Sequence, residues 1–395
     1  MKMDKKAGKS QFCQRVSDLL IRPIKSFNQP AMRLIKSPAF YIYLVAVVIF
    51  LPLFFPNLND IAPWDETYYI VSGKAILSGD FPVLANGPLL NFMASVFVLL
   101  YRKSPFWLIH VNSWMRFVLF SLVFVGTWQV AKVFKHRYKP VVLFGFLFAS
   151  PFLTQNFEYP IDLLFAAISG VAFSQVVKFI KTSDIKHVWW ASFWLGLGML
   201  TRGDAMIIIL ALTLFVMWFG RKNHTWWRLL LAVLIPFLSL SVGYVLIRGA
   251  VVGDFETGMA FRSYVAFEQG QEVALPDADA RFAAPTESYY VARELFGTPE
   301  ENEYSVFRAI SRNPQAYFVR LWAVIKTLPG LFLTAYNRRF TILLALFALR
   351  GWMVLIEEKK LPLALLHIIW VLSLSAGVAY EKILVHNSSY EGVNE

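Results

Sequence analysis

The sequence predicts an all-α polytopic membrane protein, and three observations support this fold class. Hydrophobic residues make up 57% of the 395 residues and charged residues only 16%, whereas a soluble domain carries about 25% charged residues. Apolar runs long enough to enter a bilayer recur along the chain, and basic residues gather in the loops between them. A soluble fold of this length has nowhere to bury so much apolar surface.

Nine apolar runs are the candidate membrane helices, and the shorter ones are expected to borrow flanking residues to complete a crossing. In chain order they are Phe40 to Phe55, Phe106 to Val130, Val141 to Leu153, Leu163 to Val177, Val188 to Leu200, Ala205 to Phe219, Leu229 to Ile247, Phe340 to Ile356 and Leu361 to Val378. A further short run, Pro88 to Leu100, is expected to lie along or dip into the outer interface, although Arg102 and Lys103 at its end favour a crossing.

The positions of Lys and Arg predict the orientation. Residues 1–39 carry nine of them without the cleavage pattern of a signal peptide, so the N-terminus is expected in the cytoplasm. Basic clusters at 132–139, 178–186 and 221–228 are expected on the same side. The single cysteine, Cys13, permits no intrachain disulfide, which agrees with a cytoplasmic position. We therefore expect a multi-pass protein of the cell (inner or plasma) membrane.

Four segments follow from these patterns. Residues 1–39 are a basic cytoplasmic segment, and residues 40–249 are a transmembrane module with its first outer loop at 57–105. Residues 250–339 are expected to form an outer loop with short and interfacial helices that covers the site as a lid. Residues 340–395 are expected to form a transmembrane hairpin and a tail.

This topology gathers the unusual charges on the outer face. The stretch Trp64-Asp65-Glu66-Thr67-Tyr68-Tyr69 follows the first apolar run. Asp162 comes just after Pro160 at the expected start of a helix, where a carboxylate meets the positive end of the helix dipole. Arg202 ends another helix, and Gly203 permits a sharp turn into the next one. Irregular polar chain beside a membrane usually lines a site.

An ordered set of motifs carries a resemblance to a known family. The set is Asp65-Glu66, Ser78-Gly79-Asp80-Phe81-Pro82, Asn86-Gly87-Pro88-Leu89-Leu90, Tyr159-Pro160-Ile161-Asp162 and Gly198-Met199-Leu200-Thr201-Arg202-Gly203. It resembles the GT-C membrane glycosyltransferases, with the closest likeness to the branch of the protein O-mannosyltransferases and lipid A aminoarabinose transferases. The resemblance implies a GT-C-type helix bundle that moves a sugar, with inversion, from a polyprenyl-phosphate carrier to an acceptor outside the cytoplasm.

The resemblance also implies roles for single residues. Asp65 matches the catalytic acidic residue of the first loop, with Glu66 beside it, and Asp162 matches a second acidic position. Arg202 stands where the family has a basic residue that contacts the carrier phosphate. Further candidates for substrate contacts are Tyr68, Tyr69, Glu158 and Asn86.

The residue types suit this chemistry on their own terms. A sugar held by a lipid phosphate already has a good leaving group, so the reaction needs a base for the acceptor hydroxyl and a cation for the departing phosphate. We expect Asp65 to be the general base and Arg202 the phosphate partner. Glu66 and Asp162 are expected to orient Asp65 or to share a divalent cation, Mg²⁺ or Mn²⁺, with Asp65 and Asp162 as ligands.

Each candidate also has a structural explanation. Asp65 and Asp162 could serve only as helix-opening acids, and Arg202 could extend to lipid headgroups. The pair Tyr68-Tyr69 suits an interfacial aromatic belt, and Glu158 suits a solvated loop.

Other functions stay open at this point. A transporter or lipid-carrier flippase would place intramembrane charges along a pathway, but the chain shows no repeated halves. A non-catalytic GT-C-like scaffold is the third alternative, because Asn86-Gly87-Pro88 lacks the Glu-Lys pair of some relatives. The final residues, 390–395, look like the opening of a motif that relatives follow with another membrane segment, which suggests a truncated enzyme. The net charge of +12 lies in loops that orient the chain in a lipid bilayer, so no nucleic-acid partner is expected.

Overall fold

The structure is a computed structural model that describes residues 38–55, 65–133, 160–203, 205–269, 285–319, 321–322, 326, 353 and 360–366. Within these ranges every regular element is a helix, which confirms the all-α prediction for this part of the chain. Among the described residues, three helices are long and apolar enough to cross a membrane: α5 (Trp107–Lys132), α8 (Pro160–Thr182) and α11 (Trp226–Val252).

Shorter apolar helices accompany the long ones. They are α2 (Pro38–Phe50), α4 (Pro88–Tyr101) and α10 (Ala205–Gly220), and α9 (Lys186–Met199) packs among them. The 14 residues of α4 extend over about 21 Å, less than the roughly 30 Å of a hydrocarbon core. Its predicted place in the outer interface stays a prediction. The basic segment 1–37 and most of the expected C-terminal hairpin lie outside the described residues.

Helices α5 and α8 pack side by side and run in the same direction. A Cβ on Gly126 of α5 would lie 2.7 Å from the carbonyl oxygen of Ala167 in α8, so the two backbones approach as closely as small residues allow. Farther along both helices, the Lys181 ammonium donates a hydrogen bond to the carbonyl of Val133. The two contacts advance together along both helices, so the packing is parallel. If the run Val141 to Leu153 crosses the membrane between α5 and α8, both helices must cross in the same direction. That run itself lies outside the described part.

Helices α8 and α9 form an antiparallel hairpin. Near its closed end, the Nδ1 atom of His187 lies 3.0 Å from the Oε1 atom of Gln175, and at its open end Arg202 reaches Asp162. The turn after α10 contacts the turn between α8 and α9, because the side-chain amide of Asn223 donates a 2.8 Å hydrogen bond to the Ser183 hydroxyl.

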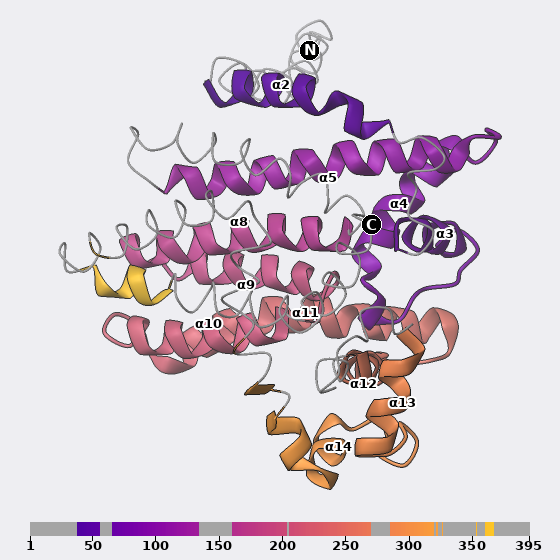
Figure 1. Cartoon of the computed structure of the whole chain (residues 1–395). Helices are drawn as coiled ribbons and strands as arrows, with labels where there is room; N and C mark the ends of the chain where they lie inside the picture. The colour runs from indigo at the N-terminus through magenta and orange to yellow at the C-terminus, as the bar shows by residue number, and fades with distance from the viewer. Residues whose placement is uncertain are drawn as a thin grey trace, which may run out of the picture.

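Helix α11 runs parallel to α9 and packs against it along small residues. The hydroxyl of Ser192 donates to the carbonyl of Val233. One turn later, a Cβ on Gly196 would lie 3.2 Å from the Cα atom of Phe237. The stacked arrangement of α5, α8, α9, α10 and α11 is visible in Figure 1.

The apolar core has two parts that share α8. One part joins α8 to α2, α4 and α5, and the other joins it to α9, α10 and α11. The outward faces are apolar as well, since Val48 is 70%, Leu214 72% and Leu246 56% exposed. An apolar surface around a bundle of crossing-length helices suits contact with lipid.

The helix directions separate the polar groups into two ends of the bundle. The site end is defined here by Asp162 at the start of α8, Arg202 after α9 and Arg248 near the end of α11. The basic end is the opposite one, where α5 and α8 finish, α9 and α11 begin and the turn after α10 lies. Its described basic residues include Lys132, Lys178, Lys181, Lys186, Arg221, Lys222 and Arg228.

Among the described residues after α11, the helices α12, α13 and α14 form a small unit of their own beside the site end (Figure 1). They are α12 (Met259–Gln269), α13 (Pro285–Phe296) and α14 (Val306–Arg312). Their common core is made of Tyr264, Phe267, Phe296 and Ala309.

Candidate functional site

The acidic pair of the first motif opens a helix. Asp65 and Glu66 are the first two residues of α3 (Asp65–Ile76), a position where acidic residues stabilise a helix through its dipole. The side chains of both residues, and all of Glu158, lie outside the described part of the structure. Their catalytic and binding roles therefore stay predictions.

Two of the predicted substrate-contact residues meet. The Asn86 side-chain amide donates a 2.8 Å hydrogen bond to the hydroxyl of Tyr68. Tyr68 lies one turn into α3, and Asn86 ends the short 3-10 turn Leu84–Asn86 that leads into α4. Tyr69 lies edge-on to the Tyr68 ring, with ring centroids 5.5 Å apart, and packs against the apolar core. Tyr68 and Asn86 thus form one polar contact, and the predicted substrate contact of Tyr69 stays a prediction.

The turn at Gly87 is wedged between the ends of two helices. Its φ angle is +63°, and a Cβ there would lie 2.3 Å from Cδ1 of Ile161 and 2.7 Å from the carbonyl oxygen of Thr201. The amide of Leu89 also donates a 2.9 Å hydrogen bond to the carbonyl of Leu200. Because Ile161 and Thr201 directly precede Asp162 and Arg202, this turn brings the Asn-Gly motif beside both charged residues.

An ion pair joins the two charged motifs. The Nη1 atom of Arg202 donates a hydrogen bond to Oδ1 of Asp162, and the two side chains are only 9% and 13% exposed. Each charge also lies at the favourable end of its helix, since Asp162 is in the first turn of α8 and Arg202 follows the last turn of α9. The sequence predicted the helix start at Pro160 and the turn at Gly203, and the structure adds the contact between the two charges.

The metal site predicted at Asp65 and Asp162 stays a prediction, because the side chain of Asp65 lies outside the described part of the structure. Asp162 is the one proposed ligand with a described side chain, and it faces a guanidinium, which repels a second cation at the same oxygen. The described ranges also hold no group of three or more His, Cys, Asp or Glu side chains placed to bind a metal. A divalent cation at this place therefore stays a prediction, and we assign no step to a metal.

Sequence reasoning missed a buried arginine at the same end of the bundle. Arg248 is 7% exposed, and its Nε atom donates a 3.0 Å hydrogen bond to the carbonyl of Phe81. Its Nη1 atom donates to both the carbonyl and Oδ2 of Asp254, each at 2.8 Å. The backbone amide of Glu256 and the Arg248 guanidinium hold the pKa of Asp254 below its usual range. A basic residue at the end of an apolar run, followed six residues later by an acid, was the available signal.

The hydrogen bonds of Arg248 are among several contacts that hold the start of α12 against the site. The amide of Ala85 donates a 3.0 Å hydrogen bond to the carbonyl of Thr257. A Cβ on Gly203 would lie 2.6 Å from Cε of Met259, the first residue of α12. The chain after α11 therefore touches both the Asn86 turn and the turn that holds Arg202.

Comparison with protein-family models, with curated proteins and with solved structures finds no match to this chain. The fold and the site themselves define its class. In the described residues it is an all-helical protein with three helices of membrane-crossing length. A half-buried polar site lies at one end of these helices, and basic residues lie at the other.

Proposed function

We propose that the chain is a GT-C-type glycosyltransferase, which moves a sugar from a polyprenyl-phosphate carrier to an acceptor at the non-cytoplasmic face of the cell membrane. The observation that carries the proposal is the Asp162–Arg202 ion pair beside the Asn86-Gly87 turn. Three motifs that are far apart in the sequence, and that resemble one family in their order, meet at this place.

The separation of the two ends of the bundle supports the orientation. Cytoplasmic loops carry an excess of Lys and Arg, so we place the basic end in the cytoplasm. The site end then faces the opposite side, where polyprenyl-linked sugars are used by the family that the sequence resembles. The proposal thus requires a full polytopic bundle, of which three helices have sufficient length in the described ranges.

The proposed reaction is a single displacement at the anomeric carbon. The oxygen of an acceptor hydroxyl attacks this carbon, and its proton passes to the carboxylate of Asp65. The bond between the anomeric carbon and the phosphate oxygen breaks, and polyprenyl phosphate leaves with the bonding electron pair. Attack from the face opposite the phosphate inverts the sugar. A positioned general base typically contributes about 10²- to 10⁴-fold to the rate.

In this scheme Arg202 stabilises the charge on the departing phosphate. A guanidinium carries five N–H donors in a planar fork and binds phosphate oxygens in pairs. Asp162 accepts a hydrogen bond from this fork and so fixes its orientation at the end of α9. We therefore propose that Asp162 positions Arg202.

The polar contact of Tyr68 with Asn86 supplies a further surface for the substrate. Both side chains line the turn that precedes Gly87, next to the ends of α8 and α9. A hydroxyl and an amide can each donate and accept a hydrogen bond, which suits the hydroxyl groups of a sugar or of an acceptor.

The test is turnover of lipid-linked sugars by the purified protein. Full-length protein in detergent is incubated with a panel of radiolabelled polyprenyl-phosphate hexoses and pentoses, and released polyprenyl phosphate is measured. We expect release with at least one donor and a loss of about 10²-fold or more in Arg202→Gln. The matched control is Arg262→Gln, which removes an exposed arginine from α12 and should retain activity. No release from any donor, or equal release by Arg202→Gln, would contradict the proposal.

A further inference from the structure

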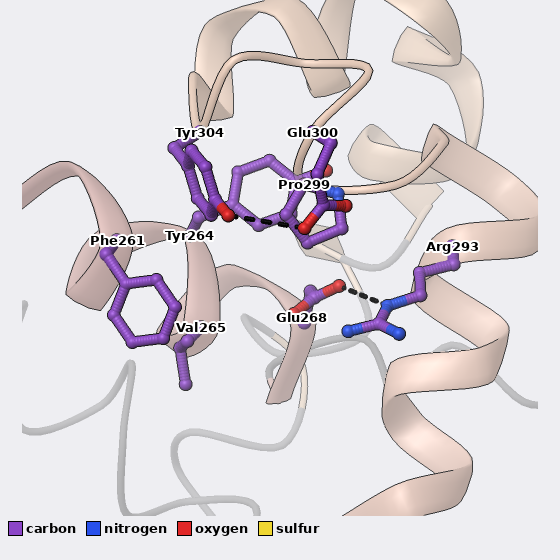
Figure 2. A pocket seen from close by; sticks show the side chains of 8 residues that line it. All are labelled: Phe261, Tyr264, Val265, Glu268, Arg293, Pro299, Glu300 and Tyr304. Atoms are coloured by element: carbon purple, nitrogen blue, oxygen red, sulfur yellow. Dashed lines mark hydrogen bonds and ion pairs between the residues drawn. The ribbon is translucent and has the colours of Figure 1, made fainter.

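The unit formed by α12, α13 and α14 contains a cavity of its own. Its volume is about 280 Å³, and it opens between α12, α13 and the turn that follows α13 (Figure 2). Aromatic rings of Phe261, Tyr264 and Tyr304 and charged groups of Glu268, Arg293 and Glu300 line it. At 100° per residue, these α12 positions lie on the side of the helix opposite Met259, which packs on the turn at Gly203. The cavity is therefore separate from the Asp162–Arg202 site.

The back wall of the cavity is held by buried hydrogen bonds. Tyr264 is 1% exposed and Asn302 is fully buried. The amide of Asn302 donates 2.8 Å and 2.9 Å hydrogen bonds to the Tyr264 hydroxyl and to the carbonyl of Phe296. The Tyr264 hydroxyl in turn donates to the carbonyl of Gly297 at 3.1 Å. A wall fixed in this way needs little reordering when a ligand enters, which favours binding.

The charges of the cavity leave one carboxylate in excess. Glu268 is 2% exposed and accepts a 2.9 Å hydrogen bond from Nε of Arg293, so these two charges cancel. Glu300 accepts a 3.2 Å hydrogen bond from the Tyr304 hydroxyl, which is a neutral donor. Among the described residues, Glu300 forms no ion pair. The Glu300 carboxylate is also the largest cause of the raised pKa of the Tyr304 phenol.

We propose that this cavity binds a protonated primary amine. The ammonium group pairs with the carboxylate of Glu300, and the alkyl part of the ligand lies against the rings of Phe261 and Tyr304. Excess negative charge beside aromatic faces attracts cations, because the face of an aromatic ring is itself electronegative. An anionic ligand would meet the Glu300 carboxylate, and the guanidinium of Arg293 is already engaged by Glu268. The inference is independent of the proposed sugar transfer.

The direct test is calorimetry with an amine and its neutral counterpart. Full-length protein in detergent is titrated with butylamine, which is protonated at neutral pH, and with 1-butanol. We expect butylamine to bind at least about tenfold more tightly than 1-butanol, and Glu300→Gln to abolish that preference. The matched control is Glu303→Gln, because Glu303 lies in the same turn but pairs with Arg308 outside the cavity.

A second variant addresses the aromatic wall. The ring of Phe261 is 56% exposed, so Phe261→Ser should fold normally, as thermal unfolding can verify, and should weaken butylamine about threefold or more. Equal affinity for butylamine and 1-butanol, equal effects of Glu300→Gln and Glu303→Gln, or no binding at all would overturn the proposal.

The source of the amine can be found in the same experiment. If lipid headgroups supply the amine, phosphatidylethanolamine should compete with butylamine for the cavity. Butylamine should then bind more weakly in nanodiscs of phosphatidylethanolamine than in nanodiscs of phosphatidylglycerol. Equal affinity in both lipids assigns the cavity to a soluble amine.

Discussion

The guanidinium of Arg202 reaches the carboxylate of Asp162 across the open end of the α8–α9 hairpin and fixes the geometry of the candidate site. Both groups are largely shielded from water, and each lies at the end of a helix that favours its charge. The same contact therefore stabilises the hairpin and holds a cation where a carrier phosphate is proposed to bind.

Removing one partner of this pair should destabilise the protein. We expect Asp162→Asn to lower the free energy of unfolding by about 3 kcal/mol, because a shielded guanidinium loses the carboxylate that faces it. Denaturant titration monitored by circular dichroism measures this change. Asp80→Asn removes an exposed carboxylate from the loop after α3 and should change stability by less than about 0.5 kcal/mol. Equal stability of the two variants would show that the ion pair is energetically unimportant.

Alanine substitutions at two glycines with positive φ angles should distinguish the cost of backbone strain from the cost of steric overlap. Gly79→Ala should cost about 1 kcal/mol, because its φ is +87° but no atom lies within 4 Å of the added Cβ. Gly87→Ala should cost about 3 kcal/mol or more, because the added Cβ overlaps Ile161 and the Thr201 carbonyl. The same denaturant titration gives both values. If the two substitutions cost the same, the Gly87 turn is not wedged between α8 and α9.

Stability should depend on pH through Asp254. Its folded-state pKa lies below the ordinary value, first because of the Glu256 amide and then because of Arg248. A group with a depressed folded-state pKa contributes stability above its unfolded pKa of about 4 and loses it as the pH falls through the folded-state value. The difference in melting temperature between wild type and Asp254→Asn should therefore be constant from pH 7 to about 5 and shrink below about pH 4. A difference that grows with acid would contradict the assignment.

Labelling from one side of the membrane tests the orientation. Cys13 is first replaced by Ser, and single cysteines are placed at Lys222, in the basic end, and at Asp80, near the site end. In intact cells, freed of any outer membrane, a membrane-impermeant maleimide should label Asp80→Cys and should label Lys222→Cys only after the membrane is opened. The reverse pattern would place the site end in the cytoplasm.

The sequence predicted the helices better than their contacts. The apolar run Leu229 to Ile247 lies inside α11, but the helix extends from Trp226 to Val252 and includes Arg248. The backbone hydrogen bonds of a helix continue past the last apolar residue, so hydropathy alone underestimates its ends. The helix start at Pro160, by contrast, was predicted correctly from the Pro and Asp of its first turn.

The site was only partly predictable, because its contacts depend on tertiary packing. The sequence identified Asp162 and Arg202 as candidates, but a hydrogen bond between residues 40 positions apart depends on how the α8–α9 hairpin closes. The contact of Tyr68 with Asn86 and the role of Arg248 in binding the Phe81 carbonyl likewise arise from tertiary packing. No periodicity or motif spacing carries that information.

The most direct test of the central claim is a single-turnover measurement with wild type and Asp65→Asn. Purified protein in excess over a radiolabelled polyprenyl-phosphate sugar, identified by the substrate screen, is mixed with an acceptor, and transfer is followed over time. We predict that Asp65→Asn lowers the transfer rate by about 10²- to 10⁴-fold while thermal unfolding and carrier binding stay close to wild type. Transfer at the wild-type rate in Asp65→Asn would contradict the proposed catalytic role of Asp65 and the mechanism built on it.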